Sequence, residues 1–200
     1  MMAMDMVRIL MTGVGGQGTL TATKILAEAA LDKGLAVTAG EVHGMAQRGG
    51  VVESAVLIGG WLSPKLGQGE ADVLLGFEPL ETLRALPYLA PGGVIVSSSE
   101  PVMPIGVSLG REGYPDLGEI ESKSRACAKA AHFLPCLSLG RQAGAVQSAN
   151  MVLLGALCAL GLAPVNLDDL KATMARRLKA RFLEMNNKAV ELGAAAVRPA

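Results

Sequence analysis

Three glycines near the N-terminus have the spacing of a phosphate-binding turn. Gly13, Gly15 and Gly18 fit the pattern G-x-G-x-x-G, and Gly16 and Gln17 lie between them. Gly13 is expected to allow a tight turn off a strand, Gly15 to let the backbone approach an anion, and Gly18 to let a helix pack close to the sheet. Free N–H groups at the start of that helix favour a phosphate. The same residues also suit a sharp turn that binds nothing.

A polar segment, residues 41–50, carries further candidate side chains. In dinucleotide enzymes an acidic side chain about 20 residues after the glycines binds a ribose hydroxyl. Glu41 lies at a similar distance from the glycines. His43 could transfer a proton near neutral pH, and Arg48 could form paired hydrogen bonds with a phosphate or carboxylate. A histidine beside a carboxylate also occurs as a structural pair, so Glu41 and His43 keep both interpretations.

Apolar runs and turn residues predict the elements that position these side chains. Strands are expected at residues 7–11, 35–39, 51–58, 71–76, 94–97 and 133–137. Helices are expected at residues 19–33, 79–89, 120–131 and 144–160, and in one long helix capped by Asn166 that reaches about residue 192. The alternation predicts a three-layer α/β fold with a mostly parallel, doubly wound sheet and two additional C-terminal helices, in a single domain over residues 1–200. In such sheets the glycine turn and residues 41–50 both follow strand ends, so they could face one crevice.

Composition excludes several classes of function. Basic and acidic residues are equal in number and aromatic residues are scarce, which argues against a nucleic-acid partner. The cysteines, Cys127, Cys136 and Cys158, have no metal-ligand spacing, so no metal or iron–sulfur site is expected. An odd number of cysteines and no targeting signal fit the cytoplasm. The uncharged stretch 143–165 has too short an apolar part to span a membrane, and we expect a buried helix there.

Four motifs in order carry a resemblance to a known family. GVGGQG at 13–18, EVHGMAQRGG at 41–50, SANMVLLG at 148–155 and N-x-A-x-x-x-G at 187–193 cover nearly the whole chain. Together they resemble the gamma-type domain of the 2-oxoacid:ferredoxin oxidoreductases, and within that family the chain is similar to a separate small subunit that serves arylpyruvate oxidation.

The resemblance implies an accessory role in the oxidative decarboxylation of a 2-oxo acid to an acyl-CoA. Thiamine diphosphate and the iron–sulfur clusters would lie in a large partner subunit, which passes electrons to ferredoxin. This chain would hold no tightly bound cofactor and no catalytic residue, with coenzyme A as a ligand of the glycine turn and Arg48. Glu41, His43 and Gln47 would face the crevice shared with the partner.

Other functions fit parts of the same pattern. The chain could be the gamma subunit of a pyruvate, 2-oxoglutarate or branched-chain 2-oxoacid enzyme. A free-standing dinucleotide-binding oxidoreductase would use the same turn, and a homodimer would then be expected. A purely structural subunit is the third alternative.

Overall fold

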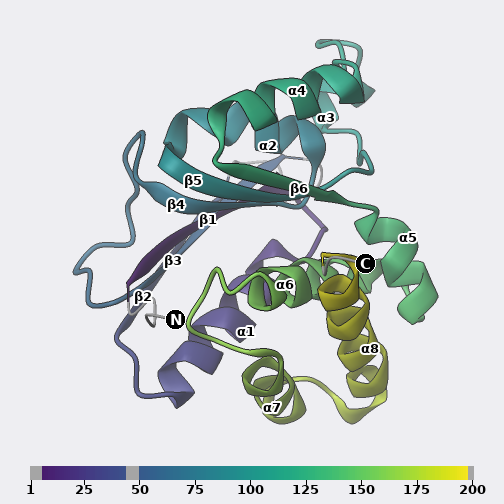
Figure 1. The fold of residues 1–200 in the computed structure, drawn as a ribbon. Coiled ribbons are helices and arrows are strands. Elements are labelled where there is room, and N and C mark those ends of the chain that lie inside the picture. Colours follow the sequence, from purple (N-terminus) through teal and green to yellow (C-terminus); the bar gives the residue numbers. More distant parts are fainter. Residues whose placement is uncertain (1–5, 44–49, 198–200) are drawn as a thin grey trace.

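The computed structural model describes residues 6–43 and 50–197 as one α/β fold built on a single sheet (Figure 1). The strands are β1 (Val7–Val14), β2 (Val37–His43), β3 (Val51–Ile58), β4 (Ala71–Gly76), β5 (Leu89–Ser98) and β6 (Ala130–Leu134). The helices are α1 (Thr19–Asp32), α2 (Pro79–Ala85), α3 (Ile105–Ser108), α4 (Leu117–Cys127), α5 (Cys136–Ala143), α6 (Ala149–Ala159), α7 (Leu167–Arg177) and α8 (Ala180–Ala196), with short 3-10 turns at η1 (Leu86–Tyr88) and η2 (Val146–Ser148).

The sheet is mixed but mostly parallel, as the alternation of strands and helices predicts. Its strand order is β2-β3-β1-β4-β5-β6. β1, β4, β5 and β6 run parallel, whereas β3 runs antiparallel to both of its neighbours. β2 is therefore parallel to β1, and the carboxyl ends of β1, β2, β4, β5 and β6 lie at the same edge of the sheet. Both the glycine turn and the end of β2 are at that edge, as expected.

Helices cover both faces of the sheet and confirm the three-layer class. Figure 1 shows α2 and α4 on one face, and α1 and α6 on the other. The larger hydrophobic core lies between the sheet and α1 and α6, and it contains Ile9, Met11, Leu26 and Leu154. A smaller core on the α2 face contains Leu10, Leu74 and Ile95. Because β1 alternates between the two faces, its apolar residues belong to both cores.

The C-terminal helices pack on the α1 and α6 layer rather than directly on the sheet. The closest approach is between α6 and α8, where a Cβ atom on Gly155 would overlap with the carbonyl oxygen of Val190. Reciprocally, a Cβ atom on Gly193 would overlap with the carbonyl oxygen of Val152. Gly155 and Gly193, which end the two C-terminal motifs, are therefore there because the helix backbones touch.

Several predicted boundaries are wrong. β1 does not end at residue 11, because antiparallel pairing with β3 carries it on to Val14. The strand expected at 94–97 is β5, which already begins at Leu89, and its pairing with β4 changes register between Ala71 and Val73. The helix expected at 120–131 is α4, which ends at Cys127 and is followed by β6.

The C-terminal third has more helices than the pattern predicts. The strand expected at 133–137 ends at Leu134, and α5 follows it. The helix expected from residue 144 begins at Ala149. The single long helix expected after Asn166 is two helices, because Leu178 adopts an extended conformation between α7 and α8. Asn166 does form the expected cap, with its side chain accepting the N–H of Asp169 at 2.9 Å.

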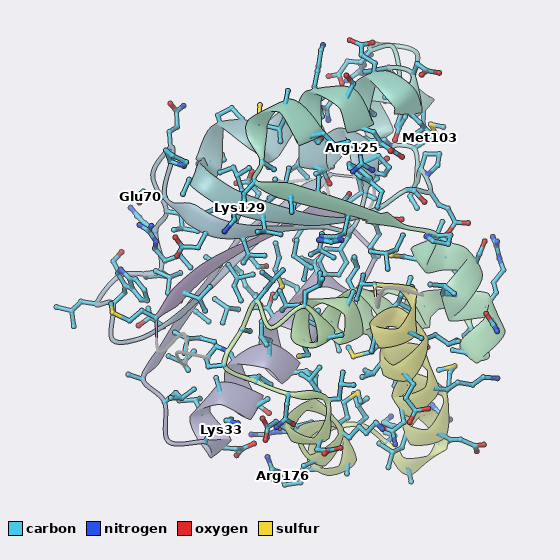
Figure 2. The ribbon with its side chains drawn as sticks, in the orientation of Figure 1. Lys33, Glu70, Met103, Arg125, Lys129 and Arg176 are labelled. Carbon is cyan, nitrogen blue, oxygen red and sulfur yellow. The ribbon has the colours of Figure 1, made fainter. Side chains whose placement is uncertain are left out.

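The basic residues of α7 mostly have acidic partners within the chain. Figure 2 shows Arg176 and Lys33 at the end of the fold where α1 and α7 meet. Arg176 pairs with Asp32, Arg177 pairs with Glu28, and Lys33 pairs with Asp169 at 2.7 Å. These ion pairs join α7 to α1, so the basic face of α7 contributes to the packing of the two helices.

Candidate functional site

The glycine turn joins the end of β1 to α1, but Gly13 does not make the tight turn expected of it. Gly13 lies within β1 and pairs with Val52 of β3. A Cβ atom at Gly13 would lie 2.7 Å from Gln17 Oε1 and 2.8 Å from the Cβ of Phe77. The missing side chain therefore leaves room for two neighbours of the turn.

Gly16 and Gly18 supply the backbone conformations of the turn. Their φ angles are +104° and +77°, values that residues with a side chain rarely adopt. Gly18 precedes the first residue of α1, and a Cβ atom there would lie 2.5 Å from Nδ2 of Asn150. The close packing expected at Gly18 is therefore against α6 and not against the sheet. The Asn150 amide also donates to the carbonyl oxygen of Gly18 at 3.1 Å.

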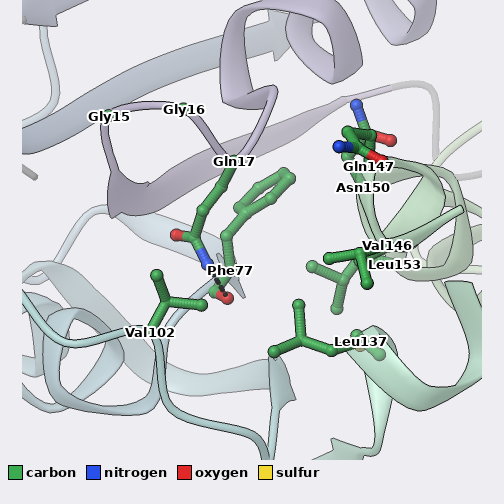
Figure 3. A pocket seen from close by; sticks show the side chains of 12 residues that line it. Gly15, Gly16, Gln17, Phe77, Val102, Leu137, Val146, Gln147, Asn150 and Leu153 are labelled. Carbon is green, nitrogen blue, oxygen red and sulfur yellow. Dashed lines mark hydrogen bonds between the residues drawn. The ribbon is translucent and has the colours of Figure 1, made fainter. Parts of the chain in front are cut away.

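The side chain of Gln17 folds back onto the protein (Figure 3). Its Oε1 accepts the N–H of Val14 at 2.8 Å, and its Nε2 donates to the carbonyl oxygen of Phe77 at 2.8 Å. Phe77 directly follows β4. Gln17 thus ties the turn to the ends of two parallel strands, and it holds the shape of the turn whatever the turn binds.

Several N–H groups at the turn have no acceptor among the residues that the structure describes. The N–H of Gly15 is used within the fold, because it donates to the carbonyl oxygen of Gly50 at 2.8 Å. In the described part of the chain, the N–H groups of Gly16, Gly18 and Thr19 have no acceptor. The first N–H groups of a helix lack intrahelical partners and carry its positive dipole end, so this is a suitable place for an anion.

Two adjoining cavities open beside the turn, and both are lined by Gly16, Gln17, Gln147 and Asn150. The first has a volume of about 260 Å³ and a mainly apolar wall. That wall is made by Phe77, Val102, Cys136, Leu137, Val146, Ala149 and Leu153. Figure 3 shows the side chains of Val102 and Leu137 projecting into this space on the side away from the glycines.

The second cavity has a volume of about 480 Å³ and lies between the start of α1 and the start of α8. Gly18 and Thr21 line one side of it, and Phe182, Met185 and Asn186 line the other. Because the two cavities share their central residues, they form one cleft with an apolar arm and a wider arm at the start of α1. We call it the turn cleft.

The polar segment after β2 is only partly described. Glu41 is exposed on β2, opposite Ser54, and borders two other hollows of about 430 and 440 Å³. Within the described part of the chain, it does not line the turn cleft. His43 ends β2, paired with Val52 of β3, but its side chain lies outside the described part of the structure. Gln47 and Arg48 also lie outside the described residues.

Buried ionisable groups lie next to the cleft. The Glu78 side chain is fully buried directly after Phe77, and burial raises its pKa despite the hydrogen bonds that the carboxylate accepts. The Cys136 thiol lines the first cavity with 1% of the residue exposed, and burial raises its pKa to about 12. At neutral pH this cysteine is therefore a thiol rather than a reactive thiolate.

The sequence motifs identified some of the residues that line the turn cleft. The pattern at 148–155 contains Asn150, but nothing in the sequence marked Phe77, Val102 or Cys136, which reach the cleft through tertiary packing. Among the described residues, no group of three or more His, Cys, Asp or Glu side chains could hold a metal ion. No helix in the described ranges is both long and apolar enough to cross a membrane.

Comparison with known proteins identifies the family. Residues 8–196 match the family model described as pyruvate ferredoxin/flavodoxin oxidoreductase. The chain belongs to this family. It is 39% identical to the indolepyruvate oxidoreductase subunit IorB of Pyrococcus horikoshii over 95% of both chains. It is 34% identical to the IorB subunit of Archaeoglobus fulgidus over 92% of both chains.

Solved structures from this oxidoreductase family share the fold. The gamma subunit of the keto/oxoacid ferredoxin oxidoreductase from Geobacter sulfurreducens is 25% identical, with a TM-score of 0.69 over 95% of this chain and 97% of that one. The pyruvate oxidoreductase subunit PORC from Thermotoga maritima is 19% identical, with a TM-score of 0.73 over 96% of each chain. The resemblance carried by the four sequence motifs is confirmed.

Proposed function

We propose that this chain is the thiamine-free small subunit of an indolepyruvate ferredoxin oxidoreductase. The observation that carries the proposal is the identity of 34–39% to four IorB subunits over more than 90% of each chain. The matches cover 92–95% of each relative, so the comparison extends over nearly the full length of these subunits.

The active enzyme is then a complex with a large subunit that holds thiamine diphosphate and the iron–sulfur clusters. Thiamine diphosphate supplies the carbanion chemistry of decarboxylation when it is bound in that subunit. The described part of this chain offers three free cysteines, of which Cys136 and Cys158 lie in packed surroundings. Its contribution is to bind and orient a reactant, and ferredoxin receives electrons from the partner.

The reactant that suits the turn cleft is coenzyme A. Its phosphates match the free N–H groups of Gly16, Gly18 and Thr19 at the start of α1. Its flexible thiol arm matches the apolar cavity beyond Gln17. The 2-oxoglutarate:ferredoxin oxidoreductase from Magnetococcus marinus, with coenzyme A and succinyl-CoA bound, contains a region of the same fold, with a TM-score of 0.71 and 23% identity over 96% of this chain and 31% of that chain.

The polar segment supplies the remaining candidates. Arg48 would neutralise a phosphate through paired hydrogen bonds. Glu41, His43 and Gln47 would contact the ligand or the partner at the carboxyl edge of the sheet. In this assignment Gly13 and Gln17 shape the turn, while Gly15, Gly16 and Gly18 let the ligand approach it.

The first test is co-purification of the tagged chain from its native cell. A large partner with thiamine diphosphate and iron–sulfur clusters, and reduction of ferredoxin with indolepyruvate and coenzyme A, are expected. A homo-oligomer that carries a bound dinucleotide would contradict the proposal.

The second test uses that complex to examine Arg48. Arg48→Ala should raise the KM for coenzyme A by about 10- to 100-fold, because a hydrogen bond to a charged group contributes about 1.5–3 kcal/mol and 1.4 kcal/mol is tenfold. Arg125→Ala, a change at an exposed residue of α4 outside the turn cleft, is the matched control. An equal KM in both variants would remove Arg48 from the coenzyme site.

A further inference from the structure

Residues 99–116, between β5 and α4, form an irregular segment that we call the strap. Apart from the single turn of α3, it has no regular structure. Val102 of the strap lines the apolar arm of the turn cleft together with Phe77 and Gln17. The strap is therefore one wall of that cavity, and the shape of the cavity depends on how the strap is held.

Several apolar side chains of the strap stay in water and do little to hold it in place. Met103, Ile105 and Leu109 are 48%, 44% and 58% exposed. Figure 2 shows Met103 at the outer side of the molecule, near α3. Pro104 of the strap is buried, but since the side chains that stay in water contribute little to packing, the position of the strap also depends on its polar attachments.

Polar contacts attach both ends of the strap. At its start, the Glu100 carboxylate accepts the N–H and the hydroxyl of Ser138 at 2.9 and 2.5 Å. Near its end, the Tyr114 hydroxyl donates to Glu78 Oε1 at 2.5 Å. Glu112 also pairs with Arg84 of α2 at the exposed side of the strap.

Glu78 is the centre of these attachments. Its Oε2 accepts the N–H of Glu81, which fixes the carboxylate at the start of α2. The backbone N–H of Val102 lies near the same carboxylate and acts to lower its pKa. Glu78 therefore holds the strap through its hydrogen bond with Tyr114, close to the cavity-lining residue Val102, and it is completely buried.

The same carboxylate is joined to the glycine turn through its neighbour in the chain. Phe77 precedes Glu78, and its carbonyl oxygen accepts the Gln17 amide at 2.8 Å. The two walls of the apolar arm, the turn and the strap, thus meet at residues 77 and 78. Burial and the neighbouring carboxylate raise the pKa of Tyr114 well above its usual range, so its hydroxyl stays a donor.

We propose that Glu78 and Tyr114 are positioning residues of the turn cleft, and that their hydrogen bond fixes the strap as the wall facing the glycine turn. Neither residue need touch the ligand. Without this bond the strap would move away from Phe77 and open the apolar arm. The link to coenzyme A affinity rests on the proposed function, whereas the positioning of the strap does not.

Cys136 provides a ligand-free test, because it is buried and lines the same cavity as Val102. The full chain is labelled with N-ethylmaleimide at fixed pH, and each cysteine is quantified by peptide mass spectrometry. Tyr114→Phe should accelerate labelling of Cys136 by about tenfold or more, since a charge-assisted hydrogen bond is lost and local opening becomes easier. Exposed Cys127 and packed Cys158 should keep their rates.

Tyr88→Phe is the matched control, because Tyr88 is the chain's other tyrosine and lies on η1. Equal labelling of Cys136 in the two variants would overturn the proposal. A parallel rise at Cys158 would mean that the whole fold opens in Tyr114→Phe. The labelling would then be repeated with Glu78→Gln, which weakens the bond from Tyr114 by removing the charge of its acceptor, and Cys136 labelling equal to that of the parent protein would also overturn the proposal.

The assembled enzyme tests the link to the ligand. Tyr114→Phe should raise the KM for coenzyme A several-fold with kcat unchanged, and Tyr88→Phe should change neither. Faster Cys136 labelling with an unchanged KM would overturn the coupling of the strap to coenzyme binding. If coenzyme A does not bind to the parent complex at the turn cleft, the coenzyme site of the proposed function fails, and the labelling result still decides the role of Tyr114.

Discussion

At the scale of single residues, Gly18 shows that the glycine pattern serves the fold as much as any ligand. Its left-handed conformation starts α1, and its bare Cα lets Asn150 approach its carbonyl group. Gly13 likewise makes room for Gln17 and Phe77. The sequence pattern predicted small residues at a turn correctly, but it could not show that their neighbours would be Phe77 and Asn150, which are distant in sequence.

Gly18→Ala tests the two reasons for a glycine at this position, the left-handed backbone conformation and the close contact with Asn150. A side chain in the left-handed region costs about 1–2 kcal/mol, and a Cβ atom at Gly18 would also collide with Asn150. Gly34→Ala is the matched control, because Gly34 has φ +76° and open space around its Cα. We expect Gly18→Ala to lose more stability than Gly34→Ala in urea unfolding. Equal losses would mean that Asn150 moves aside freely.

At the scale of elements, the sequence predicts strands better than helix ends. The apolar runs at 51–58 and 71–76 match β3 and β4 because each is bounded by turn residues. The break at Leu178 has no glycine or proline to mark it, and the apolar pattern continues across it. It arises because α7 packs on α1 while α8 packs on α6, a tertiary effect that local pattern does not contain.

The crossing of α6 and α8 tests this packing. In an open helix, replacing glycine by alanine stabilises by about 0.5–1 kcal/mol. Here Gly155→Ala and Gly193→Ala should each destabilise, by about 1–3 kcal/mol, because the new methyl group meets a carbonyl oxygen of the facing helix. Because one separation of the helices relieves both overlaps, the double variant should lose less than the sum in urea unfolding. A stabilising single change would show that the helices do not touch.

At the scale of the whole molecule, the sheet brings together a site that the sequence describes only in part. The turn, α6 and the end of β4 meet because the parallel strands end at one edge. The motif residues Gly16, Gln17 and Asn150 could be identified from the sequence. The apolar lining from Val102, Leu137 and Val146 was not, since single apolar residues in irregular or short elements look like any other core positions.

Two buried carboxyl groups at the start of α2 lead to a prediction of how the stability of the whole molecule depends on pH. Burial raises the pKa of both Glu78 and Glu81 from 4.5, and it outweighs the hydrogen bond from Tyr114 to Glu78 and the charge of Arg84 beside Glu81. The folded protein therefore holds these two protons more tightly than the unfolded chain. Their contribution to stability is complete below the unfolded pKa and is lost as the pH rises through the folded values.

Lowering the pH from neutrality toward the unfolded pKa should thus raise the free energy of unfolding through these two groups. Asp169 has the opposite effect on the free energy of unfolding, and it does so at lower pH. Burial alone would raise its pKa, yet the N–H of Asn166 and the Lys33 ammonium lower it below 3.8, so its contribution is lost only as the pH falls further. Urea unfolding between neutral pH and the unfolded pKa of the glutamates measures how the free energy of unfolding changes with pH. Glu78→Gln should flatten this dependence. Glu119→Gln, a change at an exposed residue of α4, should preserve it. A slope that Glu78→Gln leaves unchanged would mean that the proton is taken up elsewhere, and that Glu78 is ionised in the fold as readily as in the unfolded chain.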